Sequence, residues 1–415
     1  MSSESAEKVK EGVKAYYGKK LKTSDDLQTN ACKLGDKQMT PAVKSALKLI
    51  HDEVASKFYG CGLVAPEALD GMKILDLGSG SGQDCFVLSK LVGEHGHVTG
   101  VDMTKEQVDV ANKYVEYHAE QFGYSKPNTD FKLGEMEHLS DVDVANKYVE
   151  YHAEQFGYSK PNTDFKLGEM EHLSDVGIQD SSLDIIISNC VVNLTADKSV
   201  VLKEAYRVLK DGGEMYFSDV YTDTKLSEEA RKDEVLWGEC VSGALHWKEL
   251  VELSKEVGFS GPHLVTARPF VVGEHLREPL GDAQFVSATY RLFKVPESCK
   301  TDASRVTYKG SIEENPEEFK FNVYNILTKT PKLVSSDVAS VLSASRFSKH
   351  FEFQPLEPGT TVPVDDVYIQ ADPFAYCASN KVAPGACCPK PAKPVEQENG
   401  CSPKRAKTDN GARCC

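Results

Sequence analysis

The stretch Ile74-Leu-Asp-Leu-Gly-Ser-Gly-Ser-Gly-Gln-Asp84 decides the fold class of this chain. An apolar run ends in closely spaced glycines and leads into helix-forming residues, a pattern that predicts a buried strand, a cofactor-binding turn and a helix. Gly78, Gly80 and Gly82 are spaced G-x-G-x-G, so the third glycine comes one residue earlier than in the dinucleotide-binding fingerprint. Glycine lets the backbone approach a cofactor with no Cβ in between.

Two acidic residues indicate which cofactor this turn binds. Asp76 falls at the carboxyl end of the first strand, where it suits the ammonium group of S-adenosylmethionine better than a diphosphate. The next predicted strand, residues 97–103, brings Asp102 to a strand tip, where it can accept both ribose hydroxyls. The glycines alone would also fit a purely structural turn, but the two acids favour a class I S-adenosylmethionine-dependent methyltransferase core.

Length and composition limit the protein class. The chain has 415 residues, of which 40% are hydrophobic and 27% charged, as is usual for a soluble globular protein of more than one domain. A net charge of −15 argues against general nucleic-acid binding. We expect no membrane span, since the most apolar stretch, 183–194, is about a dozen residues long, and no signal peptide. A cytosolic monomer with a small-molecule substrate is therefore predicted.

A segment of the chain is repeated without change, because residues 109–142 recur as residues 143–176. Two copies with one predicted helix each do not make a helical solenoid. One copy predicts a helix over 108–122 and a strand over 129–133, which is a single unit of an α/β sheet. Either one copy is used whole, or the first supplies the helix and the second the strand. We favour the second threading, with about 127–161 as a surface loop.

Strands and helices continue to alternate after the repeat. Predicted strands over 183–190 and 214–220 flank a helix over 200–210 that ends in a glycine cap at 212–213, which indicates a doubly wound, mostly parallel α/β sheet. Further helices are predicted over 228–236 and 247–257, and further strands over 264–271 and 285–293. The predicted organisation is an N-terminal helical lid (1–60), a methyltransferase domain (61–222), a substrate-binding α+β module (223–295), a C-terminal domain (296–377) and a disordered, Cys-rich tail (378–415).

The twelve cysteines suggest a thiol site. In a chain expected to be cytosolic they should be mostly reduced, which favours metal binding or catalysis. Four stand in segments that read as a binding site: Cys32, Cys61, Cys190 and Cys240. Cys190 lies at the carboxyl end of a predicted strand, the sheet edge where α/β proteins bind ligands, within reach of a methyl donor on the glycine turn. A lone cysteine is usually a small buried hydrophobe, so the prediction depends on the four together.

These segments resemble the arsenite methyltransferase family over residues 13–374. The resemblance is carried by residues 15–18, 26–32, 59–62, 74–84, 188–194, 213–220, 236–240 and 285–293. It implies that Cys61, Cys190 and Cys240 bind trivalent arsenic and that Cys32 pairs with Cys61 as a disulfide during turnover. The resemblance also places a Met-Glu pair beside adenine, and each copy of the repeat contains one. We prefer Met170 and Glu171 of the second copy to Met136 and Glu137 of the first. The full set expected to bind the cofactor is Asp76, Gly78, Gly80, Gly82, Asp102, Met103, Met170, Glu171 and Asn189.

The implied reaction transfers methyl groups from S-adenosylmethionine to arsenite and methylarsonite, giving mono- and dimethylated arsenicals, with thioredoxin or glutathione as the thiol reductant. Trivalent arsenic is thiophilic, so thiolates suit it, and the protein mainly positions donor and acceptor. Three alternatives stay open. They are a variant inactivated by the repeat, a methyltransferase for a small organic acceptor, and a thiol metal buffer built on the cysteine pairs 387–388 and 414–415.

Overall fold

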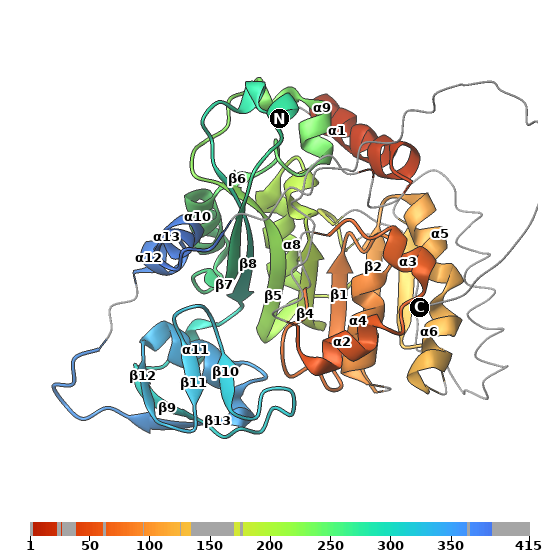
Figure 1. Cartoon of the computed structure of the whole chain (residues 1–415). Coiled ribbons are helices and arrows are strands. Elements are labelled where there is room, and N and C mark those ends of the chain that lie inside the picture. Colours follow the sequence, from red (N-terminus) through yellow and green to blue (C-terminus); the bar gives the residue numbers. More distant parts are fainter. Residues whose placement is uncertain are drawn as a thin grey trace, which may run out of the picture.

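The computed structural model describes residues 3–22, 26, 39–60, 64–93, 95–124, 126–133, 170–174, 177–362 and 366–383. One large sheet runs through this part of the chain in the order β3-β2-β1-β4-β5-β8-β7, with β6 paired to β5 (Figure 1). Strands β3, β2, β1, β4 and β5 run parallel to one another, and β8 is antiparallel to both β5 and β7. The predicted doubly wound α/β fold is therefore confirmed. Its strands are β1 (Lys73–Leu77), β2 (His97–Asp102), β3 (Thr129–Leu133), β4 (Leu183–Asn189), β5 (Leu209–Thr222), β6 (Leu245–His246), β7 (His263–Phe270) and β8 (Phe285–Phe293).

Helices cover both faces of the parallel strands, which explains their continuous apolar sequences. Ile74 of β1 packs with helices on one face, and its neighbour Leu75 packs with helices on the other. The helices and short turns before β5 are α1 (Ser3–Ala15), η1 (Tyr16–Lys20), α2 (Pro41–Leu47), α3 (Asp52–Ser56), α4 (Gln83–Val92), α5 (Lys105–Lys113), α6 (Val115–Phe122), η4 (Val192–Leu194) and α8 (Lys198–Val208). Those that follow, up to β8, are η5 (Ala230–Lys232), α9 (Glu234–Gly238), α10 (Trp247–Val257), η6 (Glu274–Leu276) and η7 (Glu278–Leu280).

The first copy of the repeat supplies both its helices and its strand, so the threading favoured from the sequence is wrong. Thr129–Leu133 forms β3 and pairs in parallel with β2. The turn before β3 is anchored by Asn128, whose side chain donates to the carbonyls of Ser89 and Gly93 at 2.8 and 2.9 Å. A short connection joins α6 to β3, so pairing of β3 with β2 does not carry the entropic cost of closing a long loop. Residues 134–169, which include most of the second copy, lie outside the described residues.

The chain after β8 forms a smaller unit below the sheet in Figure 1 and then returns to it. Strands β12, β9 and β13 form an antiparallel sheet, and β10 pairs with β11. The last helix packs against β7, and Tyr290 on β8 donates to the carbonyl of Ala371 at 2.8 Å. The elements are η8 (Glu297–Cys299), β9 (Ser304–Tyr308), β10 (Glu318–Lys320), β11 (Ile326–Thr328), β12 (Lys332–Val334), α11 (Ser336–Ala344), η9 (Ser348–His350), β13 (Phe351–Pro355), α12 (Val367–Gln370) and α13 (Pro373–Ser379).

Two other regions, the predicted substrate-binding module and the predicted tail, differ in part from what the sequence indicated. The residues expected to form a substrate-binding module, 223–295, contribute β6, α10, β7 and β8, and these three strands belong to the large sheet. The disordered, Cys-rich tail was expected to begin at residue 378, but residues 378 and 379 belong to α13, and only the part from 384 onward lies outside the described residues. Within the described part of the chain, none of the helices has the length and apolar character needed to cross a bilayer.

Candidate active site

The glycine turn between β1 and α4 folds over the end of β2. The amides of Gly78 and Ser79 donate to the carbonyl of Val101 at 2.7 and 3.1 Å, and the amide of Gly80 donates to Asp102 Oδ2 at 2.9 Å. Gly78 has φ +74°, and a Cβ there would lie 2.3 Å from Val191 Cγ2. Glycine is therefore required at this position for both its backbone conformation and its close approach to the β4 side.

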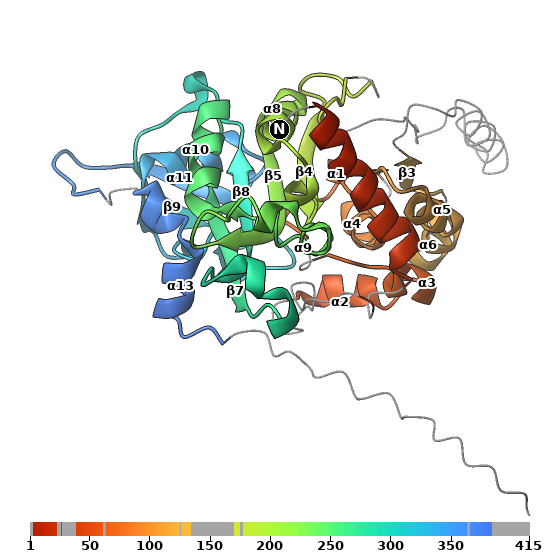
Figure 2. The same ribbon diagram turned by 90° about the horizontal axis from the view of Figure 1, so that it is seen from above.

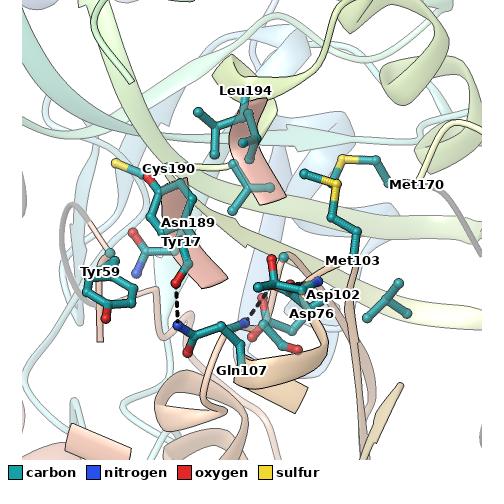
Figure 3. A pocket seen from close by; sticks show the side chains of 18 of the residues that line it. Tyr17, Tyr59, Asp76, Asp102, Met103, Gln107, Met170, Asn189, Cys190 and Leu194 are labelled. Carbon is teal, nitrogen blue, oxygen red and sulfur yellow. Dashed lines mark hydrogen bonds between the residues drawn. The ribbon is translucent and has the colours of Figure 1, made fainter. Parts of the chain in front are cut away.

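A cavity enclosing about 1150 Å³, part of it open to solvent, lies at the carboxyl ends of β1, β2 and β4 (Figure 3). This is the edge of an α/β sheet where ligands bind. Gly82, with φ +89°, begins α4 and does not line the cavity. Leu194 and Cys190 line its other side. The sequence-predicted cofactor residues that do line it are Asp76, Gly78, Gly80, Asp102, Met103, Met170, Glu171 and Asn189.

Three carboxyl groups give this cavity its electrostatic character: those of Asp76 and Asp84, which are buried, and that of Asp102, which is partly buried. Burial raises the pKa of Asp84 to about 7. Burial, and then repulsion from Asp84, raises the pKa of Asp76 well above its ordinary value. Burial also raises the pKa of Asp102, although the amides of Thr104 and Gly80 oppose the shift. Each ionised carboxylate would be stabilised by a positive charge placed beside it, so the cavity is suited to a cationic ligand.

Asp84 is a candidate binding residue that the sequence prediction missed. Its Oδ2 accepts a hydrogen bond from Asn189 Nδ2 at 2.6 Å, while its buried Oδ1 has no partner among the described residues. A buried carboxylate oxygen left without a donor is costly unless a ligand supplies one. The ammonium group of S-adenosylmethionine can supply such a donor. The position of Asp84, in the first turn of the helix after the glycines, was the available sequence signal.

Two of the four predicted cysteines come together on the opposite side, where Cys190 lines the cavity and Cys240 contacts Cys190 without lining it. Cys190 follows β4 and Cys240 follows α9, and the Cys240 thiol donates to the carbonyl of Cys190 at 2.8 Å. Both residues are buried and adopt left-handed backbone conformations, with φ +59° and +60°. Such conformations are uncommon outside glycine and recur at functional sites, where the surrounding structure maintains them.

Contacts between the two cysteine-bearing turns explain how they are held. Asn193 donates through Nδ2 to the carbonyl of Val220 at 2.6 Å and, more weakly, to that of Cys240 at 3.5 Å. Trp237 Nε1 donates to the carbonyl of Leu194 at 3.2 Å. A Cβ at Gly243 would lie only 2.0 Å from the carbonyl oxygen of Asn193. The chain following β4 and the chain following α9 therefore form one packed unit.

The redox state of this wall differs between the two cysteines. Cys240 is a reduced thiol, whereas Cys190 is disulfide-bonded. A disulfide sulfur cannot act as a thiolate ligand, so binding of a metalloid at Cys190 first requires reduction. Cys32 and Cys61, the other two predicted site residues, lie outside the described residues, and so does the predicted bond between them.

Two ionisable residues behind the cysteines were not predicted. An oxygen of Asp219 lies within 4.8 Å of both the Cys190 and Cys240 sulfurs, and the amides of Asn193 and Val220 each donate to its carboxylate at 2.9 Å. Burial raises the pKa of Asp219 to about 7. Lys198 donates to the carbonyl of Thr195 at 2.9 Å, and burial lowers its pKa to about 8. Both residues are on elements whose packing could not be derived from local sequence.

Comparison with known proteins identifies the family. A methyltransferase domain family matches residues 68–150 and 142–258, two stretches that meet at the junction of the repeat, and the arsenite methyltransferase C-terminal domain matches residues 301–401. The chain is 44% identical to arsenite methyltransferase of Rattus norvegicus over 91% of its own length and 96% of that protein. This chain belongs to the arsenite methyltransferase family. The human arsenite methyltransferase is 43% identical over 92% of this chain and 95% of its own length.

A solved structure supports the same assignment. The crystal structure of an arsenic(III) S-adenosylmethionine methyltransferase from Chlamydomonas reinhardtii matches with a TM-score of 0.66 and 38% identity. The match covers 79% of this chain and all of that one. The arsenite methyltransferase family therefore accounts for the methyltransferase sheet and for the C-terminal unit after β8.

Proposed function

We propose that this protein transfers methyl groups from S-adenosylmethionine to trivalent arsenic held by cysteine thiolates, with arsenite and methylarsonite as substrates. The observation that carries the proposal is the joining of the Cys190 and Cys240 turns beside a cavity lined by buried carboxylates. Membership of the arsenite methyltransferase family supports the choice of substrate.

The donor would be held by the residues that line the cavity. Asp76 and Asp84 would balance its positive charge, and Asp102 has lone pairs remaining for ribose hydroxyls besides those used by Gly80 and Thr104. Met103 and Met170 offer apolar, adaptable contacts for a flat base. When bound, S-adenosylmethionine supplies an electrophilic methyl group attached to a positively charged sulfur. The proposed set is Asp76, Gly78, Gly80, Asp84, Asp102, Met103, Met170, Glu171 and Asn189, with Gly82 shaping the start of α4.

The arsenic substrate would be bound by thiolates of Cys61, Cys190 and Cys240. Trivalent arsenic is soft and prefers sulfur to imidazole or carboxylate ligands. Three thiolates leave the lone pair of arsenic free to attack a methyl group, and no proton has to be removed from arsenic. The role of the protein is then to hold the thiolates and the donor in line, a contribution that can reach several kcal/mol.

A thiol reductant would complete each cycle. Methyl transfer raises arsenic from the trivalent to the pentavalent state, so two electrons must be returned. Cys32 and Cys61 can supply them by closing to a disulfide, and an external thiol such as reduced thioredoxin or glutathione can reopen it by thiol–disulfide exchange. The disulfide-bonded state of Cys190 supports the view that this wall takes part in such exchange.

The proposal is tested by measuring transfer of the labelled methyl group of S-adenosylmethionine to arsenite with purified, reduced protein. We expect Cys190→Ser and Cys240→Ser each to lower turnover by roughly a hundredfold, because a misplaced acceptor loses most of the benefit of positioning. Cys299→Ser is the matched control, since Cys299 is a free thiol remote from the cavity. Unchanged turnover in both site variants would refute the thiolate site.

A further inference from the structure

A tyrosine near the N-terminus spans the distance between the donor cavity and the Cys240 turn. Tyr17 lies in η1, a π-helical turn directly after α1, and such turns are rare and frequent at functional sites. Figure 2 shows α1 lying across the top of the molecule beside α9, the helix that leads to Cys240. Tyr17 lines the cavity, but the adjacent Tyr16 does not.

On one side, Tyr17 is attached to the element that carries Cys240. Its hydroxyl donates to the carbonyl of Gly238 at 2.7 Å and lies 3.9 Å from Cys240 Sγ. Tyr16 contacts the same turn from outside the cavity, donating to Glu239 Oε1 at 2.5 Å. A Cβ at Gly238 would lie 2.7 Å from the Tyr16 ring, so the turn fits closely against this pair of tyrosines.

On its other side, Tyr17 is attached to the donor wall. Its carbonyl accepts a hydrogen bond of 3.5 Å from Nε2 of Gln107, which is buried on α5 and lines the cavity (Figure 3). Its ring lies 5.5 Å from that of Tyr59, another cavity residue, in a tilted arrangement. Tyr17 thus contacts donor-side residues through its backbone and ring, and the Cys240 turn through its hydroxyl.

We propose that Tyr17 is a positioning residue that links occupancy of the donor cavity to the placement of the Cys240 sulfur. A ligand in the cavity fixes Gln107 and Tyr59, these hold the backbone and ring of Tyr17, and its hydroxyl then holds the Gly238–Cys240 turn. Donor binding therefore favours arsenic binding, and by linkage arsenic binding favours donor binding to the same degree. The proposal rests on the arsenic site at Cys240 proposed above.

The test compares arsenite affinity with and without saturating S-adenosylhomocysteine, which cannot donate a methyl group, in the reduced full-length protein. For the unmodified chain we expect arsenite to bind at least about fivefold more tightly in its presence, the lower end for coupled sites. In Tyr17→Phe, which retains the ring and the backbone contact, that ratio should fall to about one, while S-adenosylhomocysteine binds alone with nearly unchanged affinity. Tyr16→Phe is the matched control and should retain the ratio.

A second measurement uses the unmodified chain and so does not depend on folding of a variant. Hydrogen exchange of amides in residues 234–243 should slow when S-adenosylhomocysteine is added. Unchanged exchange there, or a Tyr17→Phe protein that retains the full affinity ratio, would overturn the role of Tyr17. Failure of the arsenic site itself would be recognised separately, because Cys240→Ser would then bind arsenite as tightly as the unmodified chain.

Discussion

Glu214 and Arg291 form a fully buried ion pair between neighbouring strands β5 and β8, with Glu214 Oε1 and Arg291 Nε 2.6 Å apart. Arg346, in the chain after α11, contacts the other oxygen of Glu214 at 2.5 Å and also donates to the backbone carbonyl of Glu67. Arg291 donates to the carbonyl of Phe321 at 2.9 Å. This network joins the C-terminal unit to the sheet that carries the active site.

Removing the shared carboxylate should destabilise the protein strongly. Glu214→Gln removes the common counter-ion of the buried Arg291 and the partly buried Arg346, and leaves Arg291 with only Glu67, 3.1 Å away; breaking a buried ion pair costs about 3–5 kcal/mol. Glu297→Gln is the control, because its pair with Lys300 is exposed and should contribute less than about 1 kcal/mol. Urea unfolding of the two variants would measure the difference. Equal stabilities would mean that the network does not hold the two units together.

The same carboxylate predicts a loss of stability in acid. Burial alone would raise the pKa of Glu214, but Arg291 and Arg346 outweigh it and hold the pKa below the ordinary value of 4.5. A lowered folded-state pKa means that this contribution is fully present above pH 4.5 and is lost as pH falls through the folded value. Unfolding free energies measured between pH 3 and 6 should therefore fall more steeply in the unmodified chain than in Glu214→Gln.

The glycine turn allows a matched pair of substitutions. Gly78 and Gly80 both have positive φ, at +74° and +52°, so alanine at either position carries a backbone cost of about 1–2 kcal/mol. Only at Gly78 would the new Cβ overlap Val191, whereas at Gly80 it would meet no atom within 4 Å. We expect Gly78→Ala to destabilise the protein more than Gly80→Ala does in urea unfolding, because only the Gly78 variant must also displace Val191. Equal stabilities of the two variants would show that the overlap with Val191 is relieved by movement.

Asp84 predicts how donor binding depends on pH. Its pKa of about 7 in the free protein means that lowering pH through 7 protonates the group and removes a charge that attracts S-adenosylmethionine. Donor affinity should therefore rise between pH 6 and 8, with Asp76 and Asp102 contributing in the same direction. Asp84→Asn should weaken binding about 10- to 100-fold at pH 8, since hydrogen bonds to charged groups contribute about 1.5–3 kcal/mol. Near pH 6, where Asp84 is mostly protonated in the free protein, calorimetry should also show that donor binding to the variant releases up to about one proton fewer than binding to the unmodified chain.

Local sequence was a good guide where one element determines its own structure. The predicted strand over 285–293 and the helix over 247–257 coincide with β8 and α10, whose apolar periodicity is strong. The helix predicted over 228–236 is instead η5 and α9, because Asp233 accepts from the amides of Val235 and Leu236 and starts a new helix there. That capping signal was present in the sequence and was missed.

Other differences come from contacts between distant segments. Gly212 was predicted to cap a helix, but α8 ends at Val208, and Gly212 lies within β5, where a Cβ would be 2.0 Å from the Ala344 carbonyl. With its positive φ and no side chain, Gly212 lets the C-terminal unit pack closely against β5. This contact cannot be recognised from local sequence. Tyr17 was missed for the same reason, because its role follows from what lies opposite it in the folded chain.

The repeat leads to a test of which copy contacts the donor. Met170, in the second copy, lines the cavity, while β3 comes from the first copy. Met170→Ala should therefore weaken S-adenosylmethionine binding about tenfold, because Met170 is partly buried and a ligand that completes the burial of a methionine side chain gains up to about 1.5–3 kcal/mol. Met136→Ala removes the same side chain from the other copy and should leave affinity unchanged in calorimetry. When residues 143–176 are deleted, Met136 is the one remaining equivalent of Met170, so Met136→Ala should then weaken donor binding. If the full chain does not bind the donor and the shortened chain does, the repeat disrupts the cavity.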